Sequence, residues 1–172
     1  PDAADLATSS AVEICGFATG NASQGLSPGC IHGVCSVETV EFVLALAALP
    51  FLRMQGGALI NMGSEASETA LALQGFYVAS KHAIKGFTDA LRIEIEELDD
   101  APISITLIQP TAVNTPYPEH AKNYLPRQPR LPTPTIDPEQ VAEAVLKAAT
   151  HGGRDVKVGL MATLDTTLAT VL

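Results

Sequence analysis

Short apolar runs alternate with longer stretches of helical periodicity through most of the chain. Ala58–Met62 follows two glycines and Ile103–Ile108 follows a proline, and both runs are short and mostly apolar, as buried parallel strands are. Val156–Val158 has the same character and predicts a third, shorter strand. Val37–Arg53 is apolar with two glutamates, and its length predicts a mostly buried helix rather than a strand.

Two further helices are predicted after the first of these strands. Asp137 is the predicted N-cap of one, with Pro138 at its first position and Gln140 near the capping-box position, and this helix runs to about Thr150. The other, Phe76–Leu98, has the helical period of about 3.6 residues. This period places one set of apolar side chains on a common side: Ala79, Ala83, Ile84, Phe87, Leu91, Ile95 and Leu98.

The remaining segments are irregular in pattern. Ala11–Phe17 has the composition of a strand, but it runs into TGNASQGLSPGCIHG, a stretch rich in turn residues that predicts a loop. Residues 63–75 form a polar loop, and residues 110–138 hold eight of the 12 prolines. The order of strands and helices predicts an α/β fold, with right-handed crossovers and a parallel sheet covered on both faces.

Composition excludes several classes of function. The chain has 172 residues, enough for one domain, and a formal net charge of −9, which disfavours binding to nucleic acid or to an anionic membrane surface. The longest apolar run, Phe42–Leu52, is shorter than the about 20 residues needed to span a bilayer. The chain begins without a basic, apolar leader, and its three cysteines are an odd number. We therefore expect reduced thiols and a cytoplasmic protein.

Polar residues with chemical potential follow the two longer predicted strands. Ser64 lies two residues past the first strand, Tyr77 begins the next helix, and Lys81 lies one helical turn further on the same face. Thr111, Asn114 and Thr115 follow the second strand. Since ligands bind beyond the carboxyl ends of the strands in such sheets, these residues are expected to converge on one rim.

The combination of serine, tyrosine and lysine suits proton transfer at a carbonyl or alcohol oxygen. A free tyrosine has a pKa near ~10, and a neighbouring ammonium group lowers that pKa by favouring the phenolate. A general acid–base works best when its pKa lies near the operating pH. A serine hydroxyl can donate a hydrogen bond to an oxygen on which charge develops. A hydride, however, has to come from a cofactor.

Four pieces of the sequence, in this order, resemble the short-chain dehydrogenase/reductase family over roughly residues 40–160. They are the strand and serine in GGALINMGS, the spacing of 13 residues from Ser64 to Tyr77, the motif YVASK, and the strand and loop in LIQPTAVNTP. The YxxxK spacing alone is a weak signal, and the four pieces together are a strong one. The resemblance implies a Rossmann-type doubly wound parallel sheet and oxidation of a secondary alcohol or reduction of a ketone with NADP or NAD.

The resemblance also implies a role for each matching residue. Tyr77 is then the acid–base catalyst, Lys81 lowers the pKa of Tyr77 and holds the cofactor ribose, and Ser64 orients the substrate oxygen. Three residues of the loop after the second strand are then expected at the nicotinamide: Pro110, Val113 and Thr115. The proline-rich residues 116–135 are expected to bind a small-molecule substrate, with no metal involved.

The chain departs from the family pattern at several points. The family's glycine-rich turn and first strands are missing, and TGNASQG, residues 19–25, is best interpreted as a degraded Asn-Asn-Ala-Gly segment. The family's proton-relay asparagine has no counterpart between Asn21 and Asn61, and Thr111 replaces a glycine. The prediction is a single partial Rossmann domain, with four parts: residues 1–36 atypical, 37–110 the catalytic core, 111–136 the substrate loop, and 137–172 the C-terminal helix and strand.

These residues also allow other interpretations. The alternative function is a non-catalytic fragment or pseudo-enzyme of the same family that acts as an interaction module. A serine hydrolase is disfavoured because MGSEA is not a G-x-S-x-G elbow, and Ser67 lies too close to Tyr77 to replace Ser64. Cys30, His32 and Cys35 lack a fourth zinc ligand and are taken as free side chains. The family often forms homodimers or homotetramers through the tyrosine helix, and the stripe of Ile84, Phe87 and Leu91 fits either such an interface or the core.

Overall fold

The computed structural model describes residues 28–120 and 130–164, with the backbone alone for residues 28–39. Three strands are parallel in the order β1-β2-β3, and each connection between neighbours contains a helix. The elements are α2 (Pro28–Gln55), β1 (Gly57–Met62), the 3₁₀ turn η1 (Glu65–Ser67), α3 (Gly75–Ile93), the π-helical turn η2 (Glu94–Asp99), β2 (Ile103–Pro110), α4 (Tyr117–His120), α5 (Pro138–His151) and β3 (Asp155–Val158).

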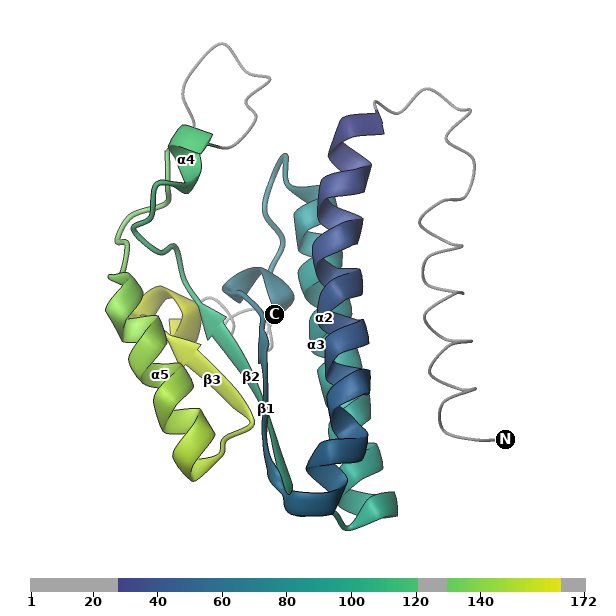
Figure 1. Ribbon diagram of the computed structural model, residues 1–172. Coiled ribbons are helices and arrows are strands. Elements are labelled where there is room, and N and C mark those ends of the chain that lie inside the picture. The colour runs from purple at the N-terminus through teal and green to yellow at the C-terminus, as the bar shows by residue number, and fades with distance from the viewer. Residues whose placement is uncertain (1–27, 121–129, 165–172) are drawn as a thin grey trace.

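Helices cover both faces of the sheet. Figure 1 shows α2 and α3 side by side against one face, while α5 lies against the other. Since β1 leads through α3 to β2, and β2 leads through α5 to β3, the strands are linked by crossovers on opposite faces. This is the parallel, two-sided arrangement of an α/β Rossmann-type fold, as the sequence predicted. Both connections step in the same direction across the sheet while their helices lie on opposite faces, so the two crossovers have opposite hands, and the prediction of right-handed crossovers is wrong for one of them.

Alternate residues of β2 divide the core between the two faces. Ile103 and Ile105 pack with Leu49, Leu91 and Ile95 against α2 and α3. A second cluster on this side joins Leu107 to Phe42 and Ile84, with the rings of Phe42 and Phe87 4.7 Å apart between centroids. Toward α5 the buried residues are fewer: Ile108, Ala148 and Val158.

The structure corrects several details of the predicted helices. Helix α2 begins at Pro28, so part of the predicted loop is helical and the helix crosses the predicted boundary at residue 37. Ala79, Ala83 and Leu98 are exposed, although the periodicity placed them on the same side as the buried Ile84, Leu91 and Ile95. Asp137 does cap α5, but its side chain makes no capping hydrogen bond.

The acidic end of the α3 region lies in solvent and carries ion pairs. Arg53 donates to Asp99 at 2.7 Å, and Arg154 donates to both carboxylate oxygens of Glu96 at 2.9 Å. These cations offset the unfavourable position of carboxylates at a helix C-terminus. Asp100 then ends the segment in the left-handed conformation with φ 47°.

No helix within residues 28–120 and 130–164 is long and apolar enough to cross a membrane.

Candidate active site

The carboxyl ends of the three strands form one rim. Met62 is the register partner of Ile108, and Pro110 is the partner of Val158, so Ser64 lies about level with Pro110. The pairing continues past the strand ends, since Gly63 N donates to Ile108 O at 2.8 Å and Thr111 N donates to Val158 O at 3.0 Å. The two loops that leave this rim carry the predicted site residues. Residues 63–74 are called the first loop and residues 111–137 the second loop.

Ser64 is buried and held by a reciprocal cap in the first loop. Its Oγ accepts a hydrogen bond from Ala66 N at 3.1 Å, and its own N donates to Ser67 Oγ at 3.1 Å. Because the Ser64 hydroxyl is an acceptor here, its proton is left for donation to a bound oxygen. Ser67, the competing serine, is 1% exposed and acts as a structural cap.

Lys81 reaches the end of β1. Its Nζ donates to Met62 O at 3.0 Å, two residues before Ser64. Tyr77 lies one turn earlier on the same helix face and is 36% exposed. This contact places Lys81 at the strand end that leads into Ser64, with Tyr77 one turn away on the same helix. His82 is exposed, with its Nδ1 2.9 Å from Val78 O, and does not join them.

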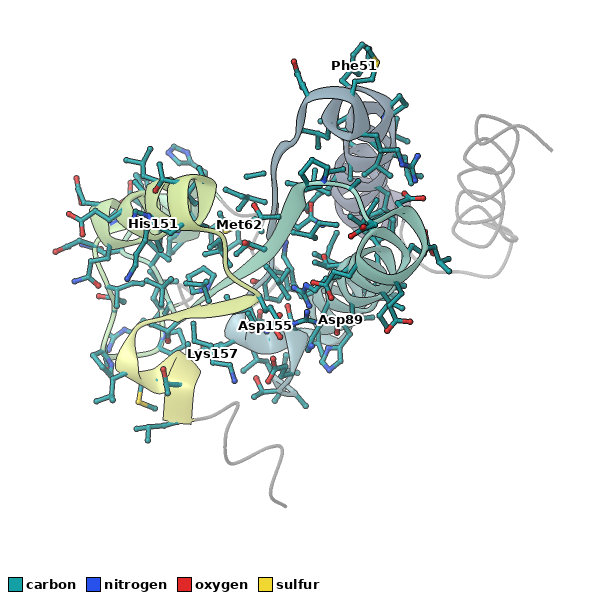
Figure 2. The ribbon with its side chains drawn as sticks, turned by 90° about the horizontal axis from the view of Figure 1, so that it is seen from below. Phe51, Met62, Asp89, His151, Asp155 and Lys157 are labelled. Carbon is teal, nitrogen blue, oxygen red and sulfur yellow. The ribbon has the colours of Figure 1, made fainter. Side chains whose placement is uncertain are left out.

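Helix α3 is fixed to the sheet by buried polar contacts that the sequence did not predict. Arg92 is 1% exposed, and its guanidinium donates to Ile105 O at 3.1 Å, Arg154 O at 3.1 Å and Asp89 Oδ1 at 2.7 Å. Asp155 lies 3.5 Å from the same group, and Figure 2 shows Asp89 and Asp155 close together. This buried cation holds α3 against β2 and β3 and so fixes the helix that carries Tyr77 and Lys81.

Asn61 makes a buried side-chain contact with α3. Its Nδ2 donates to Thr88 Oγ1 at 2.8 Å, and Thr88 in turn donates to Ile84 O at 2.7 Å. Both Asn61 and Thr88 are buried. The side chain therefore joins β1 to α3 just below the candidate site.

The surroundings of Lys85 raise its pKa. Partial burial lowers its pKa, but the hydrogen bond to Asp89 and the charges of Asp155, Asp89 and Glu68 outweigh burial and raise the pKa above 10.5. Its Nζ lies 2.7 Å from Asp89 Oδ2. Lys85 is therefore a cationic member of the network that anchors α3.

The second loop begins in contact with the rim and then becomes exposed. Thr111 is buried, Val113 pairs with Ile136, and Val113 and Thr115 are partly exposed. Gly159 follows β3 with φ +100°, and a Cβ there would lie 2.5 Å from Thr111 Cγ2. Thr111 therefore fills space that a side chain at residue 159 would need.

A further polar link joins the first loop to β2 and β3. Gln109 Nε2 donates to Glu68 Oε1 at 2.9 Å, and Lys157 Nζ lies 3.4 Å from Glu68 Oε2. Neither Glu68 nor Gln109 could be identified as a partner from sequence, because they lie 41 residues apart with no shared pattern. Their contact fixes the far side of the first loop.

Some predictions fall where the structure gives no description. The strand at Ala11–Phe17, the segment at residues 19–25 and the side chains of Cys30, His32 and Cys35 lie outside the described residues. Among the described side chains no group of three His, Cys, Asp or Glu residues is arranged to hold a metal ion.

Parallel strands with helices on both faces and polar groups at the carboxyl rim are the features of a Rossmann-type fold. The family model for short chain dehydrogenases matches residues 35–124, slightly more than half of the chain. The chain belongs to the short chain dehydrogenase family.

Individual relatives agree with this assignment. Oxidoreductase YxnA of Bacillus subtilis is 45% identical over 107 residues, which are 62% of this chain and 30% of that protein. The 3-ketodihydrosphingosine reductase of Bacteroides thetaiotaomicron is 37% identical over 70 residues, 40% of this chain and 25% of the relative. The chain thus spans less than a third of either relative.

A solved structure shares the fold. A short chain dehydrogenase from Burkholderia cenocepacia, crystallised in complex with NADP, aligns with a TM-score of 0.65 and 23% identity. The alignment covers 84% of this chain and 58% of that one.

Proposed function

We propose that this chain carries the catalytic side of an NAD(P)-dependent oxidoreductase that interconverts a secondary alcohol and a ketone. The observation that carries the proposal is the hydrogen bond of 3.0 Å from Lys81 Nζ to Met62 O. It joins the helix that bears Tyr77 to the strand that leads into Ser64. A tyrosine, a lysine and a serine at one strand end form the set that proton transfer at a carbonyl oxygen requires.

In the reductive direction Tyr77 gives its hydroxyl proton to the carbonyl oxygen of the substrate. The ammonium group of Lys81 stabilises the phenolate that remains. Ser64 donates its hydroxyl proton in a hydrogen bond to the same oxygen, and its Oγ is held in place by Ala66 N. In the oxidative direction the phenolate takes the proton back from the alcohol.

The described residues fit the nicotinamide and ribose end of a dinucleotide. Tyr77 and Lys81 offer a hydroxyl and an ammonium group for the ribose, and Pro110, Val113 and Thr115 border the same rim. The bound nicotinamide supplies or accepts the hydride. The cofactor is NADP or NAD, the substrate is a small carbonyl or alcohol compound, and the reaction takes place in the cytoplasm.

The proposal includes association with a second copy through α2 and α3. The stripe of Ile84, Phe87 and Leu91 cannot serve, because Ile84 and Leu91 are buried and Phe87 packs against the core. The outer face of α2 instead exposes a run of large apolar side chains: Val40, Val43, Leu44, Phe51 and Met54. Figure 2 shows Phe51 at the outer end of this helix. Sedimentation should give a dimer, and Leu44→Glu should give a monomer.

Turnover tests the proposed chemistry. A panel of ketones with NADPH and NADH should be reduced by the chain, and Tyr77→Phe should lower kcat by about 10²–10⁴, the usual contribution of a general acid. Thr150→Val is the control for the loss of a hydroxyl group, because Thr150 is exposed near the end of α5 and lies outside the proposed site. Equal activity of Tyr77→Phe and the unchanged chain would refute the role of Tyr77.

A further inference from the structure

An acidic side chain that no sequence motif indicated binds the same residue as Lys81. Glu41 of α2 accepts a hydrogen bond from Met62 N, with Oε1 at 2.7 Å. Met62 is also the residue whose carbonyl accepts the bond from Lys81 Nζ. A single residue of β1 therefore holds a carboxylate from one helix and an ammonium group from another.

The geometry of a strand places these two side chains on the same side. Gly57 N and Gly63 N donate to Pro102 O and Ile108 O of the β2 side. Because the backbone direction alternates along a strand, Met62 between them presents both its N–H and its C=O away from β2. Within the described residues β1 is the edge of the sheet. Glu41 and Lys81 thus satisfy both polar groups of one residue on the outer edge.

Packing fixes Glu41 at this point. Its neighbour Phe42 is 8% exposed and Ala45 is 2% exposed, so this turn of α2 is pressed against the sheet. Glu41 itself is partly buried. Figure 2 shows Met62 near the middle of the molecule, between α5 and the pair of α2 and α3. The carboxylate therefore reaches the strand end from a rigid helix.

We propose that Glu41 is a positioning residue of the site. Its carboxylate fixes the end of β1, and its charge attracts the ammonium group of Lys81 that binds the same residue. The placement of Lys81 beside Tyr77 then depends on Glu41. The catalytic consequence rests on the proposed function, whereas the placement of Lys81 can be measured without any turnover.

The first experiment uses the chain without nucleotide and compares Glu41→Ala, Glu41→Gln and the control Glu143→Gln. Glu143 lies on the exposed side of α5, away from β1. Hydrogen exchange of the Met62 amide should be about tenfold faster in Glu41→Ala, as expected for the loss of a bond to a charged acceptor. Glu41→Gln keeps an acceptor oxygen and should keep most of the protection.

Acetic anhydride labelling, read by mass spectrometry, reports on Lys81 directly. Labelling of Lys81 should be about two- to fivefold faster in Glu41→Ala, which is the change expected when a partly exposed charge interaction is lost. Lys85 should not change, because its partner is Asp89. If Glu41→Ala fails to fold, Glu41→Gln decides, with Lys81 labelled about twofold faster than in Glu143→Gln. Unchanged labelling of Lys81 in the folded variant would overturn the proposal.

Kinetics adds a readout that simple destabilisation would not give. Glu41→Gln should lower kcat by about tenfold, a part of the acid–base contribution, while KM for the carbonyl substrate stays within about twofold. Equal kcat in Glu41→Gln and Glu143→Gln would also contradict the proposal. If the unchanged chain shows no nucleotide-dependent turnover, the proposed function fails, and the labelling result still decides the role of Glu41.

Discussion

The two loops that leave the rim of the sheet are held in opposite ways. In the first loop Ser64, Glu65, Ala66 and Ser67 are all buried, and hydrogen bonds fix both ends of the η1 turn. In the described part of the second loop, Thr111 is buried and the residues from 114 to 120 are mostly exposed. The difference shows where rigidity is concentrated.

A group that must meet a reacting oxygen has to be held closely, within about 0.5 Å. The first loop meets this need through the Ser64 cap and the contact between Glu68 and Gln109. A segment that must accept different ligands gains from exposure instead. We propose that use for the second loop, whose described residues are mostly exposed beyond the pairing of Val113 with Ile136.

The largest loss of stability is expected from a substitution at Gly159, which contacts Thr111 at the start of the second loop. Gly159→Ala should reduce the free energy of unfolding by about 2–4 kcal/mol, because a Cβ would meet Thr111 and the positive φ is unfavourable for alanine. Urea unfolding measures this change. Gly75→Ala is the matched control, since a Cβ there meets nothing within 4 Å. If both variants unfold alike, Thr111 is not held in this way.

The next largest loss of stability is expected when the cap of the first loop is removed. Ser67→Ala should cost about 1–2 kcal/mol, because the buried Ser64 N–H would lose its acceptor. Ser80→Ala makes the same chemical change at a hydroxyl that bonds to Tyr77 O within α3, and it should be nearly neutral. A neutral Ser67→Ala in thermal unfolding would mean that the first loop is not held by its cap.

The smallest loss of stability is expected at Lys85, in the ion-pair network that anchors α3, and this loss depends on pH. The raised pKa of Lys85 means that its charged form stabilises the folded chain fully below pH 10.5, and this stability is lost as pH rises through the folded value. Lys85→Met should therefore cost at most about 1 kcal/mol at pH 8. The cost should shrink above pH 10.5 in urea unfolding. A cost that grows with pH would contradict this sign.

The sequence predicted the sheet well because its strands are short apolar runs bounded by glycine and proline. It placed β1, β2 and β3 within two residues at each end. It extended α3 through Leu98, but that residue lies in a π turn and is exposed. Periodicity also placed Ala79 and Ala83 on the apolar side of this helix, where they are exposed, because small apolar residues fit either a buried or an exposed helix face.

Site residues could be predicted where a local spacing carried the signal. Tyr77 and Lys81 share a helix face by sequence alone, and the structure places Lys81 at the end of β1. Glu41, Arg92 and Glu68 could not be predicted, because their partners are distant in sequence and follow no motif. Long-range polar contacts of this kind depend on how the helices pack on the sheet.

The central claim is that Lys81, held at the end of β1, forms part of a nucleotide site together with Tyr77. Titration of the chain with NADPH and with NADH, followed by nucleotide fluorescence, tests it most directly. Saturable binding should be weakened about tenfold or more by Lys81→Ala, the loss expected for a charge-assisted hydrogen bond. Lys147→Ala, on the exposed side of α5, should bind as the unchanged chain does. Absence of binding by the folded chain, or equal binding by both variants, would contradict the claim.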